Sequence, residues 1–458
     1  MTYIPKTIFR GNDIRGKENE DLNEGLLQLL GLAYGTFLRE NNTKRVIVGY
    51  DSRASSESYA NAIVSGLKQA GMSVVRIGLV LTPMVSWALH RFKIDGGVMI
   101  TASHNPVGWN GVKFFYTNHY DSSMLLDRLY DMVTNDTYKR QDGGDERTED
   151  IEDAYFQDII GRVNITRKMS IFVNTGNGTA GRFVPRLLKM GGCDVVEWNT
   201  GINPLYPHYT PDPLNEEMIQ DTAQAMVIEE CDYALMFDGD GDRVGLLDEN
   251  GSLVHPDIFL LCLIRALQQE KKRVVAVCDV MSTQALDDEC EREGVTITRV
   301  PTGYSSVREA MTREKADIAG ELSGHIFFNH NYYGFDDGLY AALKLSEYFA
   351  HHHEPVSRII QSIPQYISSR PIYIPVPDGA KMGIVEDIKS FFQKGGYSID
   401  CTDGVRVNLP YAWVIIRASQ TSPSLGIRFE AQTREGFLEI ENLIRTTLSR
   451  YDEVNVEW

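Results

Sequence analysis

The chain has 458 residues, of which 45 are Lys or Arg and 63 are Asp or Glu, so its formal net charge is −18. This acidic balance argues against a protein that binds duplex nucleic acid or an anionic membrane surface, because both partners attract positively charged faces. Hydrophobic residues make up 43% of the chain, which is enough to build buried cores and to exclude a disordered protein. At roughly 100–200 residues per domain, this length predicts about three or four domains.

The sequence also lacks the marks of a membrane or secreted protein. It contains no stretch of about 18 apolar residues that could form a transmembrane helix, and its first residues lack the long apolar core of a secretory signal. The six cysteines have no CxxC spacing, which argues against a disulfide framework or a zinc site. We therefore expect a cytoplasmic protein whose cysteines are small buried side chains.

Short apolar runs alternate with amphipathic stretches through most of the chain, which favours an α/β fold. A strand followed by a helix is predicted three times, and the first helix leads into a further strand at 74–77. The predicted strand and helix pairs are 45–51 with 57–70, 169–174 with 180–190, and 273–279 with 283–292. This pattern predicts three related α/β units, each opening with a strand that ends in polar residues.

The chain changes character after about residue 366. Pro371, Pro375 and Pro377 interrupt it, and three strands (405–409, 411–417, 426–431) then precede a final helix near 434–450. This order predicts a smaller α+β domain. The predicted domains are 1–150, 151–252, 253–366 and 367–458.

The first polar segment with chemical potential is 101–106 (TASHNP), with Lys113 shortly after it. The apolar run 97–100 leads into it, so Ser103 is expected at the end of a buried strand and exposed to a cleft. His104 and Lys113 could polarise the serine or neutralise a phosphate on it. An ordinary Asn-Pro turn with a capping serine would show the same pattern, and no GxSxG motif favours a hydrolase.

The second segment is 238–243 (DGDGDR), which follows the apolar run 234–237. Asp238, Asp240 and Asp242 alternate with glycines, a pattern that can wrap a tight loop around one divalent cation such as Mg²⁺. An EF-hand loop is an alternative, although its sixth position should be glycine and is Arg243 here. An acidic turn without metal is a further alternative, although three adjacent carboxylates would repel one another.

Three weaker segments complete the set. Residues 320–325 (GELSGH) could bind sugar hydroxyls through Glu321 and Ser323 on an exposed loop, with His325 as a proton donor or acceptor. Residues 417–424 (RASQTSPS) combine Arg417 with hydroxyls that suit a phosphate monoester. Residues 9–16 (FRGNDIRG) place two arginines around an aspartate. Glycine-bounded loops, a serine-rich turn and a salt-bridged turn are the structural alternatives.

Taken together and in this order, the five segments resemble the α-D-phosphohexomutase family, in particular its phosphomannomutase/phosphoglucomutase branch. The resemblance spans essentially the whole chain. It implies three related mixed-sheet α/β domains and a smaller C-terminal α+β domain around a central cleft. It also implies a Mg²⁺-dependent mutase that interconverts hexose 1-phosphates and 6-phosphates through a phosphoserine enzyme and a hexose 1,6-bisphosphate, which also serves as activator.

The resemblance assigns roles to individual residues. Ser103 would carry the phosphoryl group and, with Asp238, Asp240 and Asp242, contact one Mg²⁺. Arg15, His104, Lys113 and His325 would be catalytic, Lys113 and His325 as acid/base candidates. The residues implied in substrate binding are Arg243, Thr302, Gly303, Tyr304, Glu321, Ser323, Arg417, Ser419, Gln420 and Thr421. Expected partners are small sugar phosphates, with no nucleic acid or membrane partner, and the chain would be a monomer or homodimer.

Some positions depart from the family pattern. Asn12, Gln420, Ser422 and Met281 stand where members often carry an aromatic residue, an asparagine, an acidic residue or threonine, and a lysine, respectively. Tyr304 lies in the loop that helps to choose the sugar. The aminosugar branch usually has glutamine at the position of Leu322, so phosphoglucosamine mutase is a second hypothesis. A Mg²⁺-dependent phosphatase and a non-catalytic metal-binding protein are further alternatives.

Overall fold

The computed structural model describes residues 4–116, 122–419 and 422–457. The chain forms two compact units: unit 1 comprises Met1–Phe259 and Ser323–Arg358, and unit 2 comprises Leu260–Leu322 and Ile359–Trp458. Within the described ranges, no helix combines the length and the apolar character needed to cross a bilayer.

The same three-stranded arrangement occurs three times along the chain. In each case a central strand pairs in parallel with two strands that follow it in the sequence, giving the sheet orders β4-β3-β5, β9-β8-β10 and β14-β13-β15. The central strands are β3 (Arg45–Tyr50), β8 (Ser170–Asn174) and β13 (Val275–Asp279). They coincide with the three strands predicted to open related units, and the fold is therefore the expected set of α/β domains with mixed sheets.

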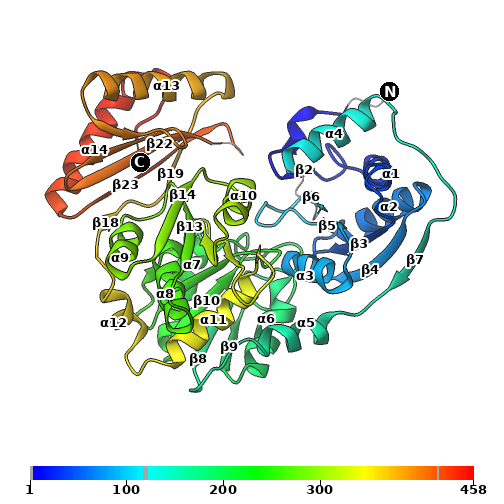
Figure 1. The fold of residues 1–458 in the computed structure, drawn as a ribbon, viewed down its shortest axis with the longest axis horizontal. Coiled ribbons are helices and arrows are strands. Elements are labelled where there is room, and N and C mark those ends of the chain that lie inside the picture. The colour runs from blue at the N-terminus through cyan, green and yellow to red at the C-terminus, as the bar shows by residue number, and fades with distance from the viewer. Residues whose placement is uncertain (1–3, 117–121, 420–421, 458) are drawn as a thin grey trace. The chain divides into compact units, whose positions relative to one another are not determined.

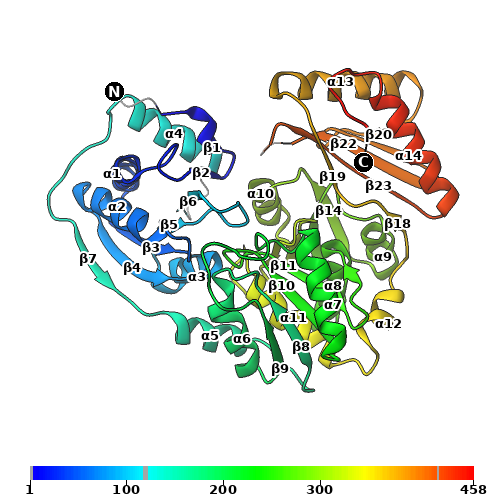
Figure 2. The ribbon, with the colours of Figure 1, turned by 180° about the vertical axis from the view of Figure 1, so that it is seen from behind.

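The first sheet has seven strands in the order β1-β2-β6-β5-β3-β4-β7. Its helices α1 and α2 lie side by side against the sheet (Figure 1), and β7 runs along its outer edge beside β4 (Figure 2). Its remaining elements are η1 (Lys6–Ile8), β1 (Phe9–Arg10), β2 (Asp13–Lys17), α1 (Glu24–Glu40), α2 (Ser56–Gln69), β4 (Ser73–Leu79), α3 (Thr82–Phe92), β5 (Gly96–Ile100), β6 (Trp109–Tyr116), α4 (Ser122–Thr134) and β7 (Asp145–Thr148).

The second sheet has the order β12-β11-β10-β8-β9, in which only β11 and β12 are antiparallel to their neighbours. The elements of this region are α5 (Glu152–Ile160), α6 (Ala180–Met190), β9 (Asp194–Trp198), α7 (Glu216–Ile228), β10 (Tyr233–Phe237), β11 (Val244–Asp248) and β12 (Leu253–Val254). Helix α8 (Pro256–Glu270) follows. Unit 1 also contains the hairpin β16 (Ile326–Phe328) and β17 (Phe335–Asp336), followed by α11 (Gly338–Ala350).

Unit 2 contains the third parallel set and the C-terminal sheet. The elements of the third set are α9 (Ala285–Glu293), β14 (Thr296–Val300), α10 (Tyr304–Glu314) and β15 (Ile318–Gly320). After α12 (Val356–Gln361), the antiparallel sheet has the order β18-β23-β22-β21-β20, and β19 also pairs with β23. Its elements are β18 (Ile367–Ser368), β19 (Ile372–Pro375), α13 (Asp378–Lys394), β20 (Ser398–Asp400), β21 (Val405–Leu409), β22 (Ala412–Ala418), β23 (Ser424–Ala431) and α14 (Arg434–Leu448).

The C-terminal domain contains one helix that the sequence reading missed. Helix α13 packs Ile384, Ile388 and Phe392 into the same apolar core as α14 and the sheet (Figure 1). The preceding prolines suggested an interrupted segment, but Pro377 stands at the N-cap, where proline is tolerated because the first helical N–H groups need no intrahelical partner. The cysteine prediction also needs one correction: Cys401 is exposed, whereas the other five cysteines are buried.

Candidate functional site

Three of the polar segments occupy the same position in the three related sheets. Ser103 follows β5, Asp238 follows β10, and Glu321 follows β15. These strands are equivalent in the sheet orders, since each is the third strand of its parallel set. Polar groups at the carboxyl ends of parallel strands are where α/β folds place ligands. The topology therefore gives one candidate loop to each related domain.

Ser103 lies in a tight, buried loop rather than on an exposed one. Its residue surface is 1% exposed, which corrects the expectation of a serine open to a cleft. Its backbone has φ 51°, in the left-handed region that few non-glycine residues adopt. Its Oγ donates a hydrogen bond to Asp238 Oδ2 at 2.7 Å and lies 3.0 Å from His104 Nδ1. The β10–β11 loop thus covers the serine and binds its hydroxyl.

Arg53, which was not predicted from the sequence, binds the loop that carries Ser103 through its guanidinium. Its buried guanidinium donates to the backbone carbonyls of Ser103, Asn105, Pro106 and Trp109 at 2.7, 2.6, 3.1 and 2.9 Å. Four bonds to one loop from one rigid group fix the shape of that loop. Arg53 lies shortly after the central strand β3. A charged residue after a strand is usually exposed, so the sequence did not predict that Arg53 would be buried.

The acidic segment forms the turn of the β10–β11 hairpin. Ligand oxygens of Asp238, Asp240 and Asp242 all lie within 4.8 Å of one another, and the three residues are buried. Both glycines are sterically required. A Cβ on Gly239 would lie 2.4 Å from the Ser103 carbonyl oxygen, and Gly241 has φ 71°. Because strands flank the loop on both sides, the EF-hand alternative, which needs two helices, is wrong.

The contacts of these carboxylates show where a cation would bind. Lys113 Nζ contacts Asp240 Oδ2 at 2.7 Å and Asp242 Oδ2 at 2.6 Å, and Thr82 Oγ1 donates to Asp240 Oδ2 at 2.5 Å. The Oδ1 atoms of Asp240 and Asp242 are buried and have no hydrogen-bond partner among the residues that the structure describes. Buried carboxylate oxygens without partners are costly unless a cation neutralises them. The loop therefore fits a hard divalent cation.

Protonation in the acidic loop is governed by burial and by mutual repulsion. Burial, together with Asp242 and Asp240, raises the pKa of Asp238 well above its usual value. Burial also opposes ionisation of Asp240 and Asp242, and Asp240 repels the charge of Asp242. The pKa of both is nevertheless lowered, by Lys113 together with Thr82 at Asp240 and by Lys113 together with His325 and Arg243 at Asp242. Burial works against the charge of Lys113 as well, yet the two carboxylates raise its pKa. Lys113 is accordingly a firmly protonated group that adds positive charge to the acidic loop.

The pKa values of the two histidines of the predicted site are shifted in opposite directions. Burial, with Arg243 and Arg15 nearby, lowers the pKa of His104 well below its usual value, so this imidazole is neutral. Burial also acts against the charge of His325, but Asp242 and Asp336 raise its pKa overall. His325 Nδ1 lies 2.7 Å from Asp336 Oδ2, and Arg243 Nε donates to His325 Nε2 at 2.9 Å.

Asp336 was not predicted from sequence. It lies at the end of β17, and its pairing with His325 follows from the β16–β17 hairpin, which only the structure reveals. The described residues contain a second group with metal-ligand geometry, Asp242, His325 and Asp336, which shares Asp242 with the acidic loop.

Arg15 and Arg243 complete the cluster in unit 1. Arg15 Nη1 donates to Asn105 Oδ1 at 2.6 Å, and Arg15 Nε donates to Asp13 Oδ2 at 2.8 Å. The backbone N–H of Arg243 donates to Asp238 Oδ1 at 3.2 Å. The structure thus brings together nine of the predicted residues in unit 1. They are Arg15, Ser103, His104, Lys113, Asp238, Asp240, Asp242, Arg243 and His325.

The predicted sugar-binding residues lie near the end of β15. Glu321 is buried, at 3% exposure, which corrects the expectation of an exposed loop. Its Oε1 accepts from the backbone N–H of Gly303 at 2.8 Å, so it is tied to the loop at 302–304. Tyr304 opens helix α10, and Ser323 lies half-buried in the turn before β16. Leu322 and Met281 belong to a buried apolar cluster with Val280, Trp413 and Ile415.

The predicted phosphate-binding residues follow β22. Arg417 is 4% exposed and donates through Nε to Asp403 Oδ2 at 2.7 Å. Ser419 Oγ accepts from the backbone N–H and the hydroxyl of Ser422, and Lys381 Nζ donates to the Ser419 carbonyl at 2.7 Å. Gln420 and Thr421 lie outside the described residues. Ser422, one of the departures from the family pattern, thus helps to shape this turn.

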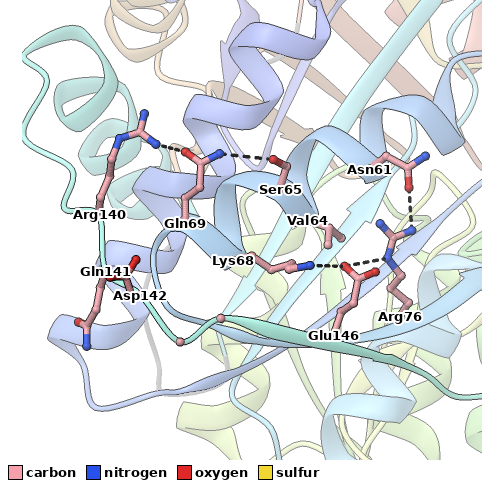
Figure 3. A pocket seen from close by; sticks show the side chains of 12 residues that line it. Asn61, Val64, Ser65, Lys68, Gln69, Arg76, Arg140, Gln141, Asp142 and Glu146 are labelled. Atoms are coloured by element: carbon pink, nitrogen blue, oxygen red, sulfur yellow. Dashed lines mark hydrogen bonds and ion pairs between the residues drawn. The ribbon is translucent and has the colours of Figure 1, made fainter.

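A separate cavity of about 570 Å³ lies in unit 1 between α2, β4, β7 and the segment 140–144. Figure 3 shows that its cations already face partners: Lys68 contacts Glu146 at 3.3 Å, Arg76 donates to Asn61 at 2.7 Å, and Arg140 contacts Gln69. None of the predicted site residues is among those that line it. Its internally paired charges do not indicate an anion site.

Comparisons with known proteins cover the chain from end to end. Its sequence matches four domain families described as phosphoglucomutase/phosphomannomutase: alpha/beta/alpha domain I at residues 6–139, domain II at 153–251, domain III at 255–366 and the C-terminal domain at 372–446.

Individual relatives agree with these domain matches. A phosphomannomutase/phosphoglucomutase of Pseudomonas syringae pv. tomato is 33% identical over 447 residues, covering 98% of this chain and 96% of that one. A phosphoglucomutase of Neisseria gonorrhoeae is 33% identical over 452 residues, covering 98% of each chain. The crystal structure of a phosphoglucomutase/phosphomannomutase family protein from Burkholderia thailandensis has a TM-score of 0.90 at 29% identity, covering 98% of each chain.

Proposed function

Because the chain belongs to the phosphoglucomutase/phosphomannomutase family and is a hexose phosphate mutase, we propose that Ser103 carries the phosphoryl group that it transfers. The observation that carries this proposal is the position of Ser103 Oγ, 2.7 Å from a carboxylate of the buried acidic loop. A serine held against three clustered carboxylates has little use as a structural cap. It suits a phosphoryl donor that works beside a cation.

The acidic loop would hold Mg²⁺ through Asp238, Asp240 and Asp242, and the phosphoryl group on Ser103 would contact the ion. The ion would supply charge stabilisation for the transferring phosphoryl group. The residues fit this role, because two of their oxygens are buried and accept no hydrogen bond from any residue that the structure describes, and the oxygen-rich set suits a hard cation. Arg15, Arg243 and Lys113 add positive charge around the same cluster.

The reaction divides into two transfers that balance. In the first, a hydroxyl of the hexose monophosphate attacks the phosphorus on Ser103. The bond from phosphorus to Oγ breaks and a bond from phosphorus to the sugar oxygen forms. The hydroxyl proton passes to a base of the cluster and Oγ regains a proton, which gives a hexose 1,6-bisphosphate and an unmodified serine. In the second, after the intermediate has turned round, Ser103 Oγ gives up its proton and attacks the phosphorus of the other phosphate. The bond from that phosphorus to the sugar oxygen breaks and the sugar oxygen takes up a proton, which restores the phosphoserine and releases the isomeric monophosphate.

Three groups of the cluster could move the protons. His104 is neutral and lies 3.0 Å from Ser103 Oγ, where it could accept the serine proton during the second transfer. Lys113, held protonated by Asp240 and Asp242, is the second candidate, as a donor to Ser103 Oγ when the phosphoryl group departs. His325, oriented by Asp336, is the third candidate. We propose His325 as the group that carries the proton, since the raised pKa of Lys113 makes it a weak acid and the lowered pKa of His104 makes it a weak base.

We propose that residues of unit 2 recognise the substrate. Glu321 and the loop at 302–304 would bind sugar hydroxyls, whereas Arg417 and Ser419, with Gln420 and Thr421, would bind the phosphate that does not react. The sugars are glucose, mannose or both, since relatives carry both names. Leu322 disfavours glucosamine, because it stands where the aminosugar branch usually has glutamine.

A coupled assay tests the proposal directly. Glucose 1-phosphate, mannose 1-phosphate and glucosamine 1-phosphate would be supplied separately, each with a hexose 1,6-bisphosphate activator and Mg²⁺. We expect the 6-phosphate isomer of glucose or mannose to form without free phosphate. Stoichiometric release of inorganic phosphate would instead indicate the phosphatase alternative, and preference for glucosamine phosphate would indicate the aminosugar branch.

A further inference from the structure

Asp403 connects two loops to which the proposed function gives separate tasks. It lies in the turn between β20 and β21, outside every segment that the sequence singled out. A single oxygen, Oδ2, accepts both from Arg417 Nε at 2.7 Å and from the backbone N–H of Thr302 at 3.1 Å. The Arg417 and Asp403 side chains are 5% and 12% exposed, so this ion pair is largely shielded from water.

The connection continues to the proposed sugar-binding carboxylate. Gly303, the neighbour of Thr302, donates its backbone N–H to Glu321 Oε1 at 2.8 Å. Three hydrogen bonds and one peptide link thus join the proposed phosphate-binding arginine to the proposed sugar-binding glutamate. All four residues and Asp403 belong to unit 2.

The backbone of the turn is built for this contact. Gly404 has φ 77°, and a Cβ there would lie 2.4 Å from the Ile416 carbonyl oxygen and 2.7 Å from Arg417 Cα. Only glycine allows the turn to lie this close to β22. The close approach places the Asp403 carboxylate directly beside the Arg417 side chain.

We propose that Asp403 is a positioning residue that holds the phosphate-binding Arg417 and the sugar loop at 302–303 at a fixed distance from each other. This inference rests on the proposed function of both loops. Because Asp403 occupies Nε, it orients the plane of the guanidinium, and the terminal nitrogens are the ones that would bind a phosphate in a fork. The same carboxylate fixes the backbone at Thr302, next to the residue that binds Glu321. The distance between the groups that bind the phosphate and those that bind the sugar is therefore fixed.

The consequence appears in substrate binding and in sugar discrimination. Contacts to the phosphate that does not react are equally strong in the ground state and in the transition state, so their loss raises KM more than it lowers kcat. The loop at 302–303 loses an anchor at the same time. The ratio of kcat/KM for glucose 1-phosphate to that for mannose 1-phosphate therefore changes, which a merely structural role of Asp403 would not cause.

Asp403→Asn and Asp403→Ala test the inference, with Asp400→Asn as the matched control. Asp400 is the last residue of β20, three positions before Asp403, and within the described part of the chain its carboxylate accepts hydrogen bonds from Thr402 alone. We expect Asp403→Ala to raise KM for both sugars roughly tenfold, as for the loss of a hydrogen bond to a charged group, and to change the sugar ratio several-fold. Asp403→Asn, which keeps the shape of the side chain and one acceptor, shows a smaller change of the same kind. Asp400→Asn matches the wild type.

Two further measurements separate this inference from the proposed function. Hexose 1,6-bisphosphate at saturating concentration should still phosphorylate Ser103 in Asp403→Ala, because the substitution leaves the cluster in unit 1 unchanged. Intact mass measures this phosphorylation. In the double variant Arg417→Lys/Asp403→Ala, the effects on KM should be less than additive.

The outcomes divide clearly. A wild type without mutase activity overturns the proposed function. An active wild type with unchanged KM and unchanged sugar ratio in folded Asp403→Asn and Asp403→Ala overturns the role of Asp403 alone. If Asp403→Ala does not fold, Asp403→Asn, which preserves volume, decides the question by the same two readouts.

Discussion

The substitution Arg53→Lys tests whether the loop that carries Ser103 is shaped by a buried cation beneath it. Arg53 donates four hydrogen bonds to carbonyls of residues 103–109, and its Nε lies 3.4 Å from Asp51 Oδ2. The ring of Tyr206 lies 5.3 Å from the guanidinium and covers it. Lysine keeps the charge, so Asp51 is not left as an isolated buried anion. A single nitrogen cannot reach all four carbonyls, however.

The size of the effect follows from these contacts. If lysine loses two of the four bonds, at about 1.5 kcal/mol each for bonds from a charged donor, the free energy of unfolding falls by about 3 kcal/mol, which a folded domain survives. Ser103 has φ 51°, a conformation that costs about 1–2 kcal/mol and persists only while its surroundings hold it. When the hydrogen bonds from residue 53 to these carbonyls weaken, the backbone of Ser103 moves toward a less strained conformation and its side chain is displaced. A displacement of about 1 Å at a reacting group can cost about 100-fold in rate, so we expect kcat to fall by about that factor.

The assay measures isomer formation and, separately, the rate at which hexose 1,6-bisphosphate phosphorylates the enzyme. Arg76→Lys is the matched control, because Arg76 is a half-buried arginine of the same domain whose bond to Asn61 lies in the cavity of Figure 3. We expect Arg53→Lys to slow both rates and Arg76→Lys to change neither. The reasoning is refuted if Arg53→Lys keeps the wild-type kcat and phosphorylation rate, or if both variants lose activity equally.

Three more predictions concern the metal and the substrate contacts. Asp240→Asn should lower kcat by about 1,000-fold, since the cation supplies several kcal/mol of charge stabilisation, while circular dichroism and the unfolding midpoint stay near the wild type; an active variant would contradict the metal assignment. Excess chelator should abolish isomer formation and added Mg²⁺ should restore it, so full activity in chelator would refute a metal requirement. Arg417→Lys should raise KM about tenfold with little change in kcat, because a bidentate grip on phosphate becomes a single contact; a fall in kcat at constant KM would place Arg417 at the reacting phosphate instead.

Much of the fold could be predicted because hydrophobic runs and their spacing are local properties. The central strands β3, β8 and β13 and the helices α2, α6 and α9 that follow them fall within a few residues of the predicted ranges. The equivalence of β5, β10 and β15 could not be deduced in this way, because it depends on which strands pair. Helix α13 was missed since proline at a helix N-cap and proline in a break look alike in sequence.

The candidate site shows the same division. The acidic loop was predictable, because three carboxylates separated by glycines are a local pattern with one dominant chemical explanation. Arg53, Asp336 and Asp403 were not, since each acts on a partner that is far away in sequence or reached only through a hairpin or sheet. The burial of Ser103 and Glu321 was also beyond prediction, because it results from loops of other strands packing over them.

The most direct test of the central claim follows one labelled phosphoryl group. Dephosphorylated enzyme would be mixed with hexose 1,6-bisphosphate bearing a radiolabelled phosphate, digested, and its peptides sequenced, with Ser103→Ala treated in parallel. The account predicts one labelled phosphoryl group per chain on Ser103, chased into hexose monophosphate by unlabelled substrate, and no label in Ser103→Ala. Label on another residue, or Ser103→Ala that turns over like the wild type, would contradict it.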